Sequence, residues 1–233
     1  MAQKLIIFIL ILITSNISFS RVSRIDWVCQ CQNATEEAKV TFDAIRDVKK
    51  GRWGKATCAQ AYDRLVQQNE LNLSNREISD LRPLSPFTNL ERVDLSKNLI
   101  SDLEPLSDLA KLKRLKLNSN KISGLGPLSE LVGIIVLDLS NNKISNLEPL
   151  AKLDLWAGLN LIGNQISDLS PLSEIQRLHH LRLDRNLISD LSPLENLPLD
   201  FLSLFGNRIR DFSPIEERFK DPNRTLIRGE QYY

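Results

Sequence analysis

Residues 90–100, which read LERVDLSKNLI, decide the fold of this chain. Val93 and Leu95 alternate with polar residues, and this period of two predicts a short strand with both aliphatic side chains inward and Asp94 outward. Asn98 follows the strand, where we expect its amide to donate to and accept from buried backbone groups that the strand ladder leaves unpaired. The stretch therefore predicts a strand that ends in an asparagine-stabilised turn.

The same pattern recurs along the chain with a step of 22 residues. The ladder asparagines are Asn98, Asn120, Asn142, Asn164, Asn186 and Asn207, the last after a step of 21. Prolines keep this step at Pro83, Pro105, Pro127, Pro149, Pro171 and Pro193, and Pro214 also arrives one residue early. We place the lost residue within 196–199. A unit of this length cannot bury its aliphatic face alone, so we expect the units to stack and stabilise one another.

The segment after each asparagine, such as residues 100–112, has an apolar residue at every third position. A period of three fits short 3₁₀ or irregular turns. Pro105 fits this segment because proline gives up a backbone donor where no strand ladder needs one. We therefore expect an α/β repeat solenoid, a curved right-handed array with parallel strands on the concave side and these turns on the convex side.

These units resemble the 22-residue leucine-rich repeats of bacterial internalin-type proteins, which are also seen in eukaryotic phosphatase-regulating repeat proteins. The resemblance covers roughly residues 71–215. It implies a leucine-rich-repeat solenoid that acts by binding. Two positions depart from the pattern. Arg76 replaces the ladder asparagine in the first unit, as expected of an edge repeat. Trp156 replaces a leucine at a strand entrance, and we expect it in the core.

Four segments are expected in the chain. They are a signal peptide (1–20), a helical N-terminal cap (21–67), the leucine-rich repeats (68–213) and a C-terminal cap with a tail (214–233).

The signal peptide is indicated by Lys4 before the apolar run 5–13, with a cut expected after Ser20. A nine-residue helix spans only about 14 Å, less than a hydrocarbon core of about 30 Å. We therefore expect a secreted or periplasmic protein without stable membrane insertion.

The N-terminal cap has apolar residues at helical spacing in 34–49 and 57–67, which predicts two helices. We expect Trp53 to pack on the open end of the array. The alternative is an independent effector segment. At the other end, residues 225–227 fit a final irregular strand.

Export permits disulfides, and the mature chain offers Cys29, Cys31 and Cys58. Cysteines separated by one residue rarely bridge each other, so we expect Cys58 to bond either Cys29 or Cys31. A metal or redox site is the alternative, although three thiolates without a fourth ligand indicate one only weakly.

Catalytic chemistry is poorly supported. His179 and His180 are the two histidines, and neighbours on alternate faces of a strand do not readily chelate one ion. The serines recur with the repeat at Ser79, Ser101, Ser123, Ser145, Ser167 and Ser189, which fits turns rather than a unique nucleophile. The acids Asp80, Asp102, Asp168 and Asp190 also recur, and we expect them to be solvated surface. We expect no enzyme, no cofactor and no metal.

The outward positions of the strands form the expected binding surface. They include Arg92, Asp94, Lys97, Arg114, Lys116, Asp138, Asn160, His180, Arg182, Arg185, Phe201 and Phe205.

Two features of this surface favour a protein partner. Arg92, Lys97, Arg114 and Lys116 would form a basic patch offset only by Asp94, which favours an acidic partner; a merely solvated face is the alternative. Phe201 and Phe205 would be rigid anchors beside arginines, unless they cover the last repeat.

The expected function is therefore that of a secreted protein-binding module that acts as a monomer. A formal net charge of +1 gives no indication of a nucleic-acid partner. The alternatives are a structural envelope or adhesion component without a dedicated partner, or an enzyme regulator of the phosphatase-regulating type.

Overall fold

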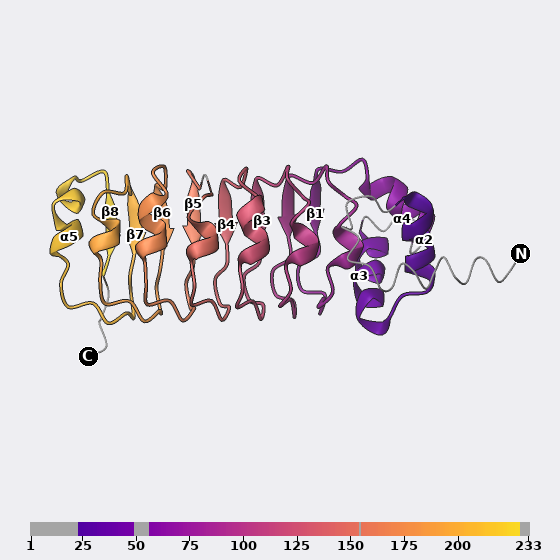
Figure 1. Ribbon diagram of the computed structural model, residues 1–233, viewed down its shortest axis with the longest axis horizontal. Helices are drawn as coiled ribbons and strands as arrows, with labels where there is room; N and C mark the ends of the chain where they lie inside the picture. Colours follow the sequence, from indigo (N-terminus) through magenta and orange to yellow (C-terminus); the bar gives the residue numbers. More distant parts are fainter. Residues whose placement is uncertain (1–22, 49–55, 154, 229–233) are drawn as a thin grey trace, which may run out of the picture.

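The strands of the repeats form one continuous parallel sheet (Figure 1). The computed structural model describes residues 23–48, 56–153 and 155–228, and within them eight strands pair in chain order. They are β1 (Glu70–Asn72), β2 (Arg92–Asp94), β3 (Arg114–Lys116), β4 (Val136–Asp138), β5 (Gly158–Asn160), β6 (His180–Arg182), β7 (Phe201–Ser203) and β8 (Thr225–Ile227). The middle side chain of each strand from β1 to β7 is buried, as the alternation around Val93 predicts.

The return segments contain short 3₁₀ helices, each with a repeated proline in its first turn. They are η2 (Arg82–Leu84), η3 (Glu104–Leu106), η4 (Gly126–Glu130), η5 (Glu148–Leu150), η6 (Ser170–Glu174) and η7 (Ser192–Leu194). In the last repeat, α5 (Ser213–Glu216) and η8 (Arg218–Lys220) occupy this place. Leu103, Leu106 and Leu109 show how the period of three places aliphatic side chains in the core between turns and sheet. The predicted leucine-rich-repeat solenoid is confirmed.

The ladder asparagines connect consecutive repeats through backbone groups. Asn142 Oδ1 accepts from the backbone N–H of Ile122 at 3.0 Å. Its Nδ2 donates to the carbonyls of Leu117 and Leu139, both at 3.0 Å. Asn142 is itself buried. One side chain therefore satisfies buried polar groups in its own repeat and in the repeat before it.

The prediction that Trp156 lies in the core is wrong. Trp156 is 43% exposed, whereas Leu155 is fully buried at the strand entrance. In the preceding repeat, two residues separate Leu131 from the buried Ile134; here only one residue separates Leu153 from Leu155. The loop is one residue shorter and the approach to the strand one residue longer, so the smaller side chain fills the core and the tryptophan faces solvent.

Among the described residues, three helices cover the end of the array next to β1 (Figure 1). They are α2 (Arg24–Gln32), α3 (Glu36–Asp47) and α4 (Cys58–Leu65). Helices α3 and α4 lie within the two predicted helical segments. The signal peptide expected at 1–20 and Trp53 lie outside the described residues.

Helix α2 was not predicted, because only Trp27 of its residues is buried and the helix therefore has no apolar periodicity. Trp27 does what was expected of Trp53: its indole Nε1 donates to the carbonyl of Pro83 at 2.9 Å. Its ring also contacts Phe42 and Phe87, with centroid separations of 4.9 and 5.7 Å. This aromatic cluster joins the helices to the first repeat.

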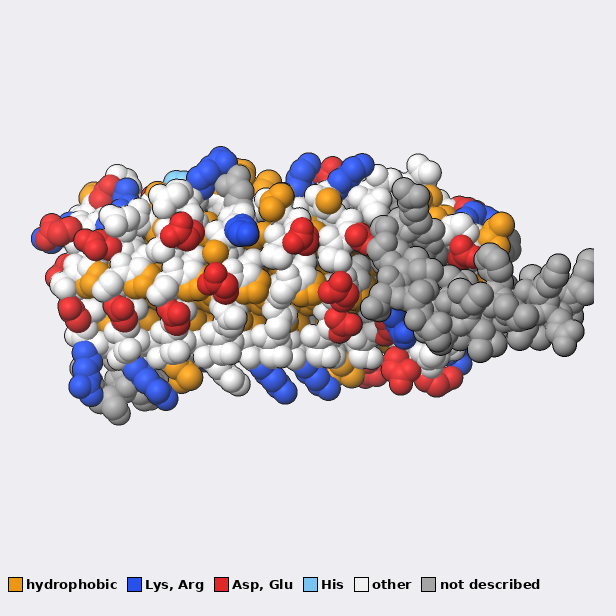
Figure 2. All heavy atoms as spheres, viewed as in Figure 1, with side chains coloured by type: hydrophobic (Ala, Val, Ile, Leu, Met, Phe, Trp, Pro, Cys, Tyr) orange, Lys and Arg blue, Asp and Glu red, His pale blue; other side chains and the backbone are white. Residues whose placement is uncertain are grey.

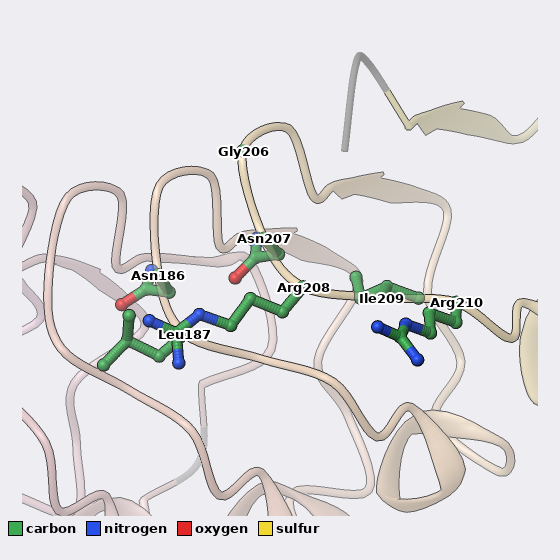
Figure 3. A pocket seen from close by; sticks show the side chains of 7 residues that line it. All are labelled: Asn186, Leu187, Gly206, Asn207, Arg208, Ile209 and Arg210. Atoms are coloured by element: carbon green, nitrogen blue, oxygen red, sulfur yellow. The ribbon is translucent and has the colours of Figure 1, made fainter. Parts of the chain in front are cut away.

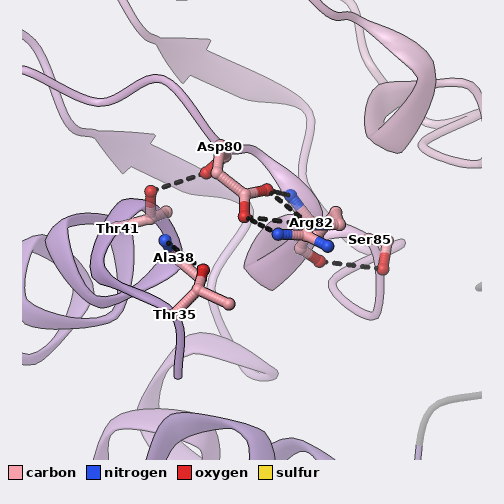
Figure 4. Close-up of polar contacts among 6 residues, drawn as sticks. All are labelled: Thr35, Ala38, Thr41, Asp80, Arg82 and Ser85. Carbon is pink, nitrogen blue, oxygen red and sulfur yellow. Dashed lines mark hydrogen bonds and ion pairs between the residues drawn. The ribbon is translucent and has the colours of Figure 1, made fainter. Parts of the chain in front are cut away.

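A buried hydroxyl adds a polar contact at the same junction (Figure 4). Thr41 of α3 is fully buried, and its Oγ1 donates to the carbonyl of Asp80 at 2.6 Å. The Asp80 carboxylate in turn accepts from the backbone N–H of Arg82 at 2.9 Å and pairs with the Arg82 guanidinium. The helical end is thus tied to the first 3₁₀ turn by specific hydrogen bonds as well as by apolar packing.

A disulfide joins Cys31 to Cys58 and so links α2 to α4. Cys29 is exposed and free. Of the two pairings left open by the sequence, the structure has the one with Cys31.

At the opposite end of the array, β8 pairs with β7 and places Leu226 against Leu202. This is the final strand expected from residues 225–227. None of the helices among the described residues has both the length and the apolar character that crossing a bilayer requires.

Candidate protein-binding surface

The candidate surface is the exposed face of the sheet, which we call the sheet face and which corresponds to the predicted concave side. Since the strands pair in register, equivalent side chains form rows. The first row is Glu70, Arg92, Arg114, Val136, Gly158, His180, Phe201 and Thr225. The second row is Asn72, Asp94, Lys116, Asp138, Asn160, Arg182, Ser203 and Ile227.

The predicted basic patch on this face is partly neutralised. Arg92 forms an ion pair with Glu70, and Lys116 Nζ lies 3.5 Å from Asp94 Oδ2. The expectation that only Asp94 offsets these cations is therefore wrong, because the register of the atypical first repeat brings Glu70 opposite Arg92. Arg114 is exposed and makes no ion pair with a described residue, so its charge stays uncompensated at this end of the face.

Lys97 and Arg185 lie at the strand-end turn rather than in the two rows. Each directly precedes a ladder asparagine and has a left-handed backbone with a φ of 56°. At the same place in another repeat stands Gly163, for which this conformation carries no steric cost. The turn thus fixes where these two cations project, at the border of the sheet face.

The acidic and amide residues of the second row build the turns that follow them. Asp138 Oδ1 accepts from both the backbone N–H and the hydroxyl of Ser140, at 3.0 and 2.7 Å. Asp94 does the same with Ser96, and Asn160 accepts from the backbone N–H of Ile162. Sequence reasoning assigned these side chains to binding and missed this structural role.

An aromatic and cationic cluster lies where β6 meets β7. The Arg182 guanidinium lies over the Phe201 ring, 5.3 Å from its centroid, which is a favourable cation–π geometry. The His180 and Phe201 rings lie 6.1 Å apart. His180 and Arg182 are exposed and Phe201 is half-buried. Phe201 therefore contacts both of the other predicted binding residues, and part of its ring is open to a partner.

Phe205 lies beyond the end of β7 and is also half-buried. Its backbone N–H donates to Asp184 Oδ1 at 2.7 Å, and the hydroxyl of Ser203 donates to the same oxygen. Asp184 therefore fixes the backbone that carries both phenylalanines.

The two histidines have separate surroundings. His180 faces Phe201 in the first row, whereas His179 Nδ1 lies 2.7 Å from Asp200 Oδ2. Within the described parts of the chain, no three His, Cys, Asp or Glu side chains are grouped as metal ligands.

The recurring acids on the turn side are mostly exposed and also have a structural role that sequence reasoning missed. Each accepts a hydrogen bond from the backbone N–H two residues later, as Asp168 does from Ser170 and Asp190 from Ser192. The serine hydroxyl and then the backbone N–H lower the pKa of both carboxyls. In one repeat Asn146 does the same for Glu148. These side chains start the 3₁₀ turns.

Comparison with known proteins agrees with this architecture. The family model described as "Leucine Rich repeats (2 copies)" matches residues 69–108 and 110–152. No curated protein matches the sequence significantly.

Solved structures give a more specific likeness. An internalin of Listeria monocytogenes (inlF) is 31% identical with a TM-score of 0.70, and the match covers 83% of this chain and 55% of that one. Internalin C2 of the same organism (inlC2) is 28% identical with a TM-score of 0.56, covering 84% and 92%. This chain thus spans little more than half of the first of these relatives.

A more distant neighbour is the ectodomain of the Arabidopsis thaliana receptor kinase GASSHO1/SCHENGEN3, solved in complex with CASPARIAN STRIP INTEGRITY FACTOR 2. It is 20% identical with a TM-score of 0.58, and the match covers 73% of this chain and 22% of that one. At this identity the likeness concerns the fold alone.

Proposed function

The chain is a leucine-rich-repeat protein of the internalin type, and we propose that it binds another protein through the sheet face, with the β6–β7 cluster as the anchor. The repeat family and its structural neighbours support a protein–protein interaction module rather than an enzyme. The observation that carries the proposal is the half-buried Phe201 held between His180 and Arg182.

The chemistry of the cluster supports a protein partner. Aromatic residues and arginine dominate the energetics of protein interfaces, and they act best in a pre-organised, rigid setting. Phe201 lies on a strand paired on both sides, so little conformational entropy is lost when it is covered. Arg114, Lys97 and Arg185 add positive charge around the face, which favours a partner with an acidic surface.

The proposal also includes an extracellular location for the protein. The internalin neighbours support an extracellular or surface protein. We infer that residues 1–20 direct export, that the exported protein works as a monomer, and that the segments 21–67, 68–213 and 214–233 are its cap, repeats and C-terminal closure. Amino-terminal sequencing of exported protein should begin at Arg21, and a mature chain that retains Met1 would overturn the export proposal.

The binding proposal is tested by capture on immobilised protein. The double substitution Phe201→Ala with Arg182→Ala removes the anchor, and Glu148→Ala on the exposed turn side is the control. We expect a host or surface protein to be captured by the wild type and by the control, and to be lost with the double variant. Circular dichroism checks that all three fold. Equal capture by all three proteins would remove the sheet face from the function.

A further inference from the structure

The residue directly after each ladder asparagine forms a second exposed row, which we call the asparagine edge. The row is Leu99, Lys121, Lys143, Gln165, Leu187 and Arg208, and Glu77, which follows Arg76 in the first repeat, begins it. Its side chains are held in order, because each backbone N–H from Leu99 to Arg208 donates at 2.8 Å to a carbonyl of the preceding repeat, as Lys121 does to Ile100 and Lys143 to Ile122. The edge is thus a rigid line of side chains outside the sheet face.

Positive charge collects on this edge without compensation. Lys121, Lys143, Arg208 and the nearby Arg210 are all exposed, and none of them forms an ion pair with a described residue. Some other exposed cations are paired, as Arg92 is with Glu70 and Lys113 with Glu91. Figure 2 shows blue and orange side chains along the lower rim of the repeats, below a face that carries rows of red ones. The formal net charge of the whole chain is only +1, so the excess of positive charge on this edge is local.

Apolar side chains interrupt the row of cations. Leu99 is 42% exposed and Leu187 is 38% exposed, whereas most leucines of the repeats are buried. A polyanionic sugar or nucleic acid would use the cations but would gain nothing from the leucines. A peptide with both acidic and apolar side chains would use both.

A pocket lies at the end of the edge nearest α5 (Figure 3). It is lined by Asn186, Leu187, Gly206, Asn207, Arg208, Ile209 and Arg210 and has a volume of about 400 Å³. The two arginine side chains extend in the same direction along the edge, that of Arg208 toward Leu187 (Figure 3). This volume is small for a ligand pocket and suits one or two side chains, and the Arg208 guanidinium beside Leu187 suits a carboxylate next to an apolar side chain.

We propose that the asparagine edge binds an extended acidic peptide segment of a partner, with one carboxylate on Arg208, an apolar side chain on Leu187, and Arg210 adding positive charge at the end of the edge. The four repeat steps from Lys121 to Arg208 span about 19 Å at roughly 4.8 Å per step, which is about six residues of extended chain. Side chains on one face of such a peptide are about 7 Å apart. Two further carboxylates therefore reach Lys143 and Lys121. This site is separate from the sheet face and does not depend on what binds there.

The spacing defines the probe. The fluorescent heptapeptide Glu-Ser-Glu-Ser-Leu-Ser-Glu, made in both sequence directions, places three carboxylates and one leucine on one face. Binding is measured by fluorescence anisotropy at low and physiological salt. One of the two peptides should bind more tightly than the other. We expect the double variant Arg208→Glu with Arg210→Glu to weaken the binding of this tighter peptide about tenfold or more. The matched control, Lys39→Glu with Lys152→Glu at exposed positions outside both surfaces, makes the same change in charge and should alter it less than about twofold.

A second arm tests the apolar contact. Leu187→Ala should weaken binding of the leucine-containing peptide several-fold. It should leave unchanged the binding of a peptide with serine in place of leucine. Equal losses in both double variants would overturn the proposal in favour of nonspecific charge. Heparin that binds the edge more tightly than the peptide, with no effect of Leu187→Ala, would overturn it in favour of a polyanion. A glutamine-for-glutamate peptide that binds as well as the acidic one would also overturn it. None of these outcomes bears on the sheet-face cluster, so the two proposals fail or stand separately.

Discussion

Asn142 shows at the residue scale how one side chain holds two repeats together. Its amide makes hydrogen bonds to backbone groups of its own repeat and of the preceding one, all in buried surroundings. Alanine would leave these groups without a partner and without access to water. The cost of such unsatisfied groups is about 1–3 kcal/mol.

We therefore expect Asn142→Ala to lower the free energy of unfolding by about 1–3 kcal/mol. Lys152→Ala, an exposed substitution, is the control and should change it by less than about 0.5 kcal/mol. Urea denaturation followed by circular dichroism measures both. Equal midpoints would mean that water or a relaxed backbone replaces the ladder bonds.

Leu155 and Trp156 set a limit on what the repeat pattern can predict. Counting in steps of 22 from Leu112 and Ile134 places Trp156 inward, but the pattern does not reveal that the loop before it is one residue shorter. Both neighbours are apolar, so composition cannot separate them. The choice is made by volume, since a close-packed core sized for leucine or isoleucine does not accept an indole without strain.

The pair gives a direct test of this correction. Leu155→Ala should destabilise the protein by about 2–5 kcal/mol, because it leaves a cavity in the core. Trp156→Ala should cost less than about 1 kcal/mol despite the larger side chain removed. Thermal or urea unfolding of the two variants measures the difference, and the reverse order would restore Trp156 to the core.

At the scale of single elements, the 3₁₀ turns depend on short side chains that sequence reasoning assigned to plain surface. Asp168 and Asp190 each accept from the backbone N–H two residues later, and Asp211, which sequence reasoning did not single out, does the same at the start of α5. For Asp211 the backbone N–H of Ser213 contributes most to the lowered pKa and the hydroxyl second. A hydrogen-bonded carboxylate in each turn is thus more stable as the anion in the folded chain than in the unfolded one.

The lowered pKa values set the direction in which the stability of the fold changes with pH. The folded pKa values lie below the ordinary value of 3.8, so the turns contribute stability at neutral pH and lose it as the pH falls below about 4 through the folded values. The triple variant Asp168→Asn, Asp190→Asn and Asp211→Asn keeps the acceptor, as Asn146 does naturally, and removes the titration. Its Tm should fall less than that of the wild type between pH 6 and pH 3. Parallel Tm curves would exclude this linkage.

Helices show a different limit of prediction. α3 and α4 present an apolar stripe to the first repeat, and that stripe is visible in the sequence. α2 contributes only Trp27 to the core and is held by a capping box at Ser23 and Asp26 together with the disulfide of Cys31. A helix that packs through one large side chain leaves no period to detect.

At the scale of the whole molecule, the one-dimensional array makes the fold far more predictable than the binding surface. Each repeat contacts its neighbours in the same way, so one unit specifies the sheet, the turns and the asparagine ladder. Charge pairing across the sheet face depends instead on which residues lie opposite one another in adjacent repeats. Glu70 was overlooked for this reason, and its position opposite Arg92 comes from the strand register.

The ion pairs also change what is expected of the basic end of the sheet face. Arg92 and Lys116 each have an acidic neighbour, so the uncompensated charge comes mainly from Arg114 and Lys97. Exposed charges act on diffusional encounter and are screened over about 8 Å at physiological salt. An anchor such as Phe201 acts only once the complex has formed. The two ends of the face should therefore control different rate constants.

Surface plasmon resonance with the identified sheet-face partner tests this division. Arg114→Glu with Lys116→Glu should lower the association rate several-fold at low salt and less at physiological salt, with little change in dissociation. Phe201→Ala should raise the dissociation rate about tenfold or more and leave association within about twofold, because a buried aromatic anchor contributes after encounter. Glu148→Ala serves as the control for both. If the charge reversal leaves association unchanged at both salt concentrations, steering plays no part and the partner docks through the β6–β7 end alone. If Phe201→Ala slows association instead of speeding dissociation, Phe201 is needed to organise the free surface, and the anchor must be sought elsewhere on the face.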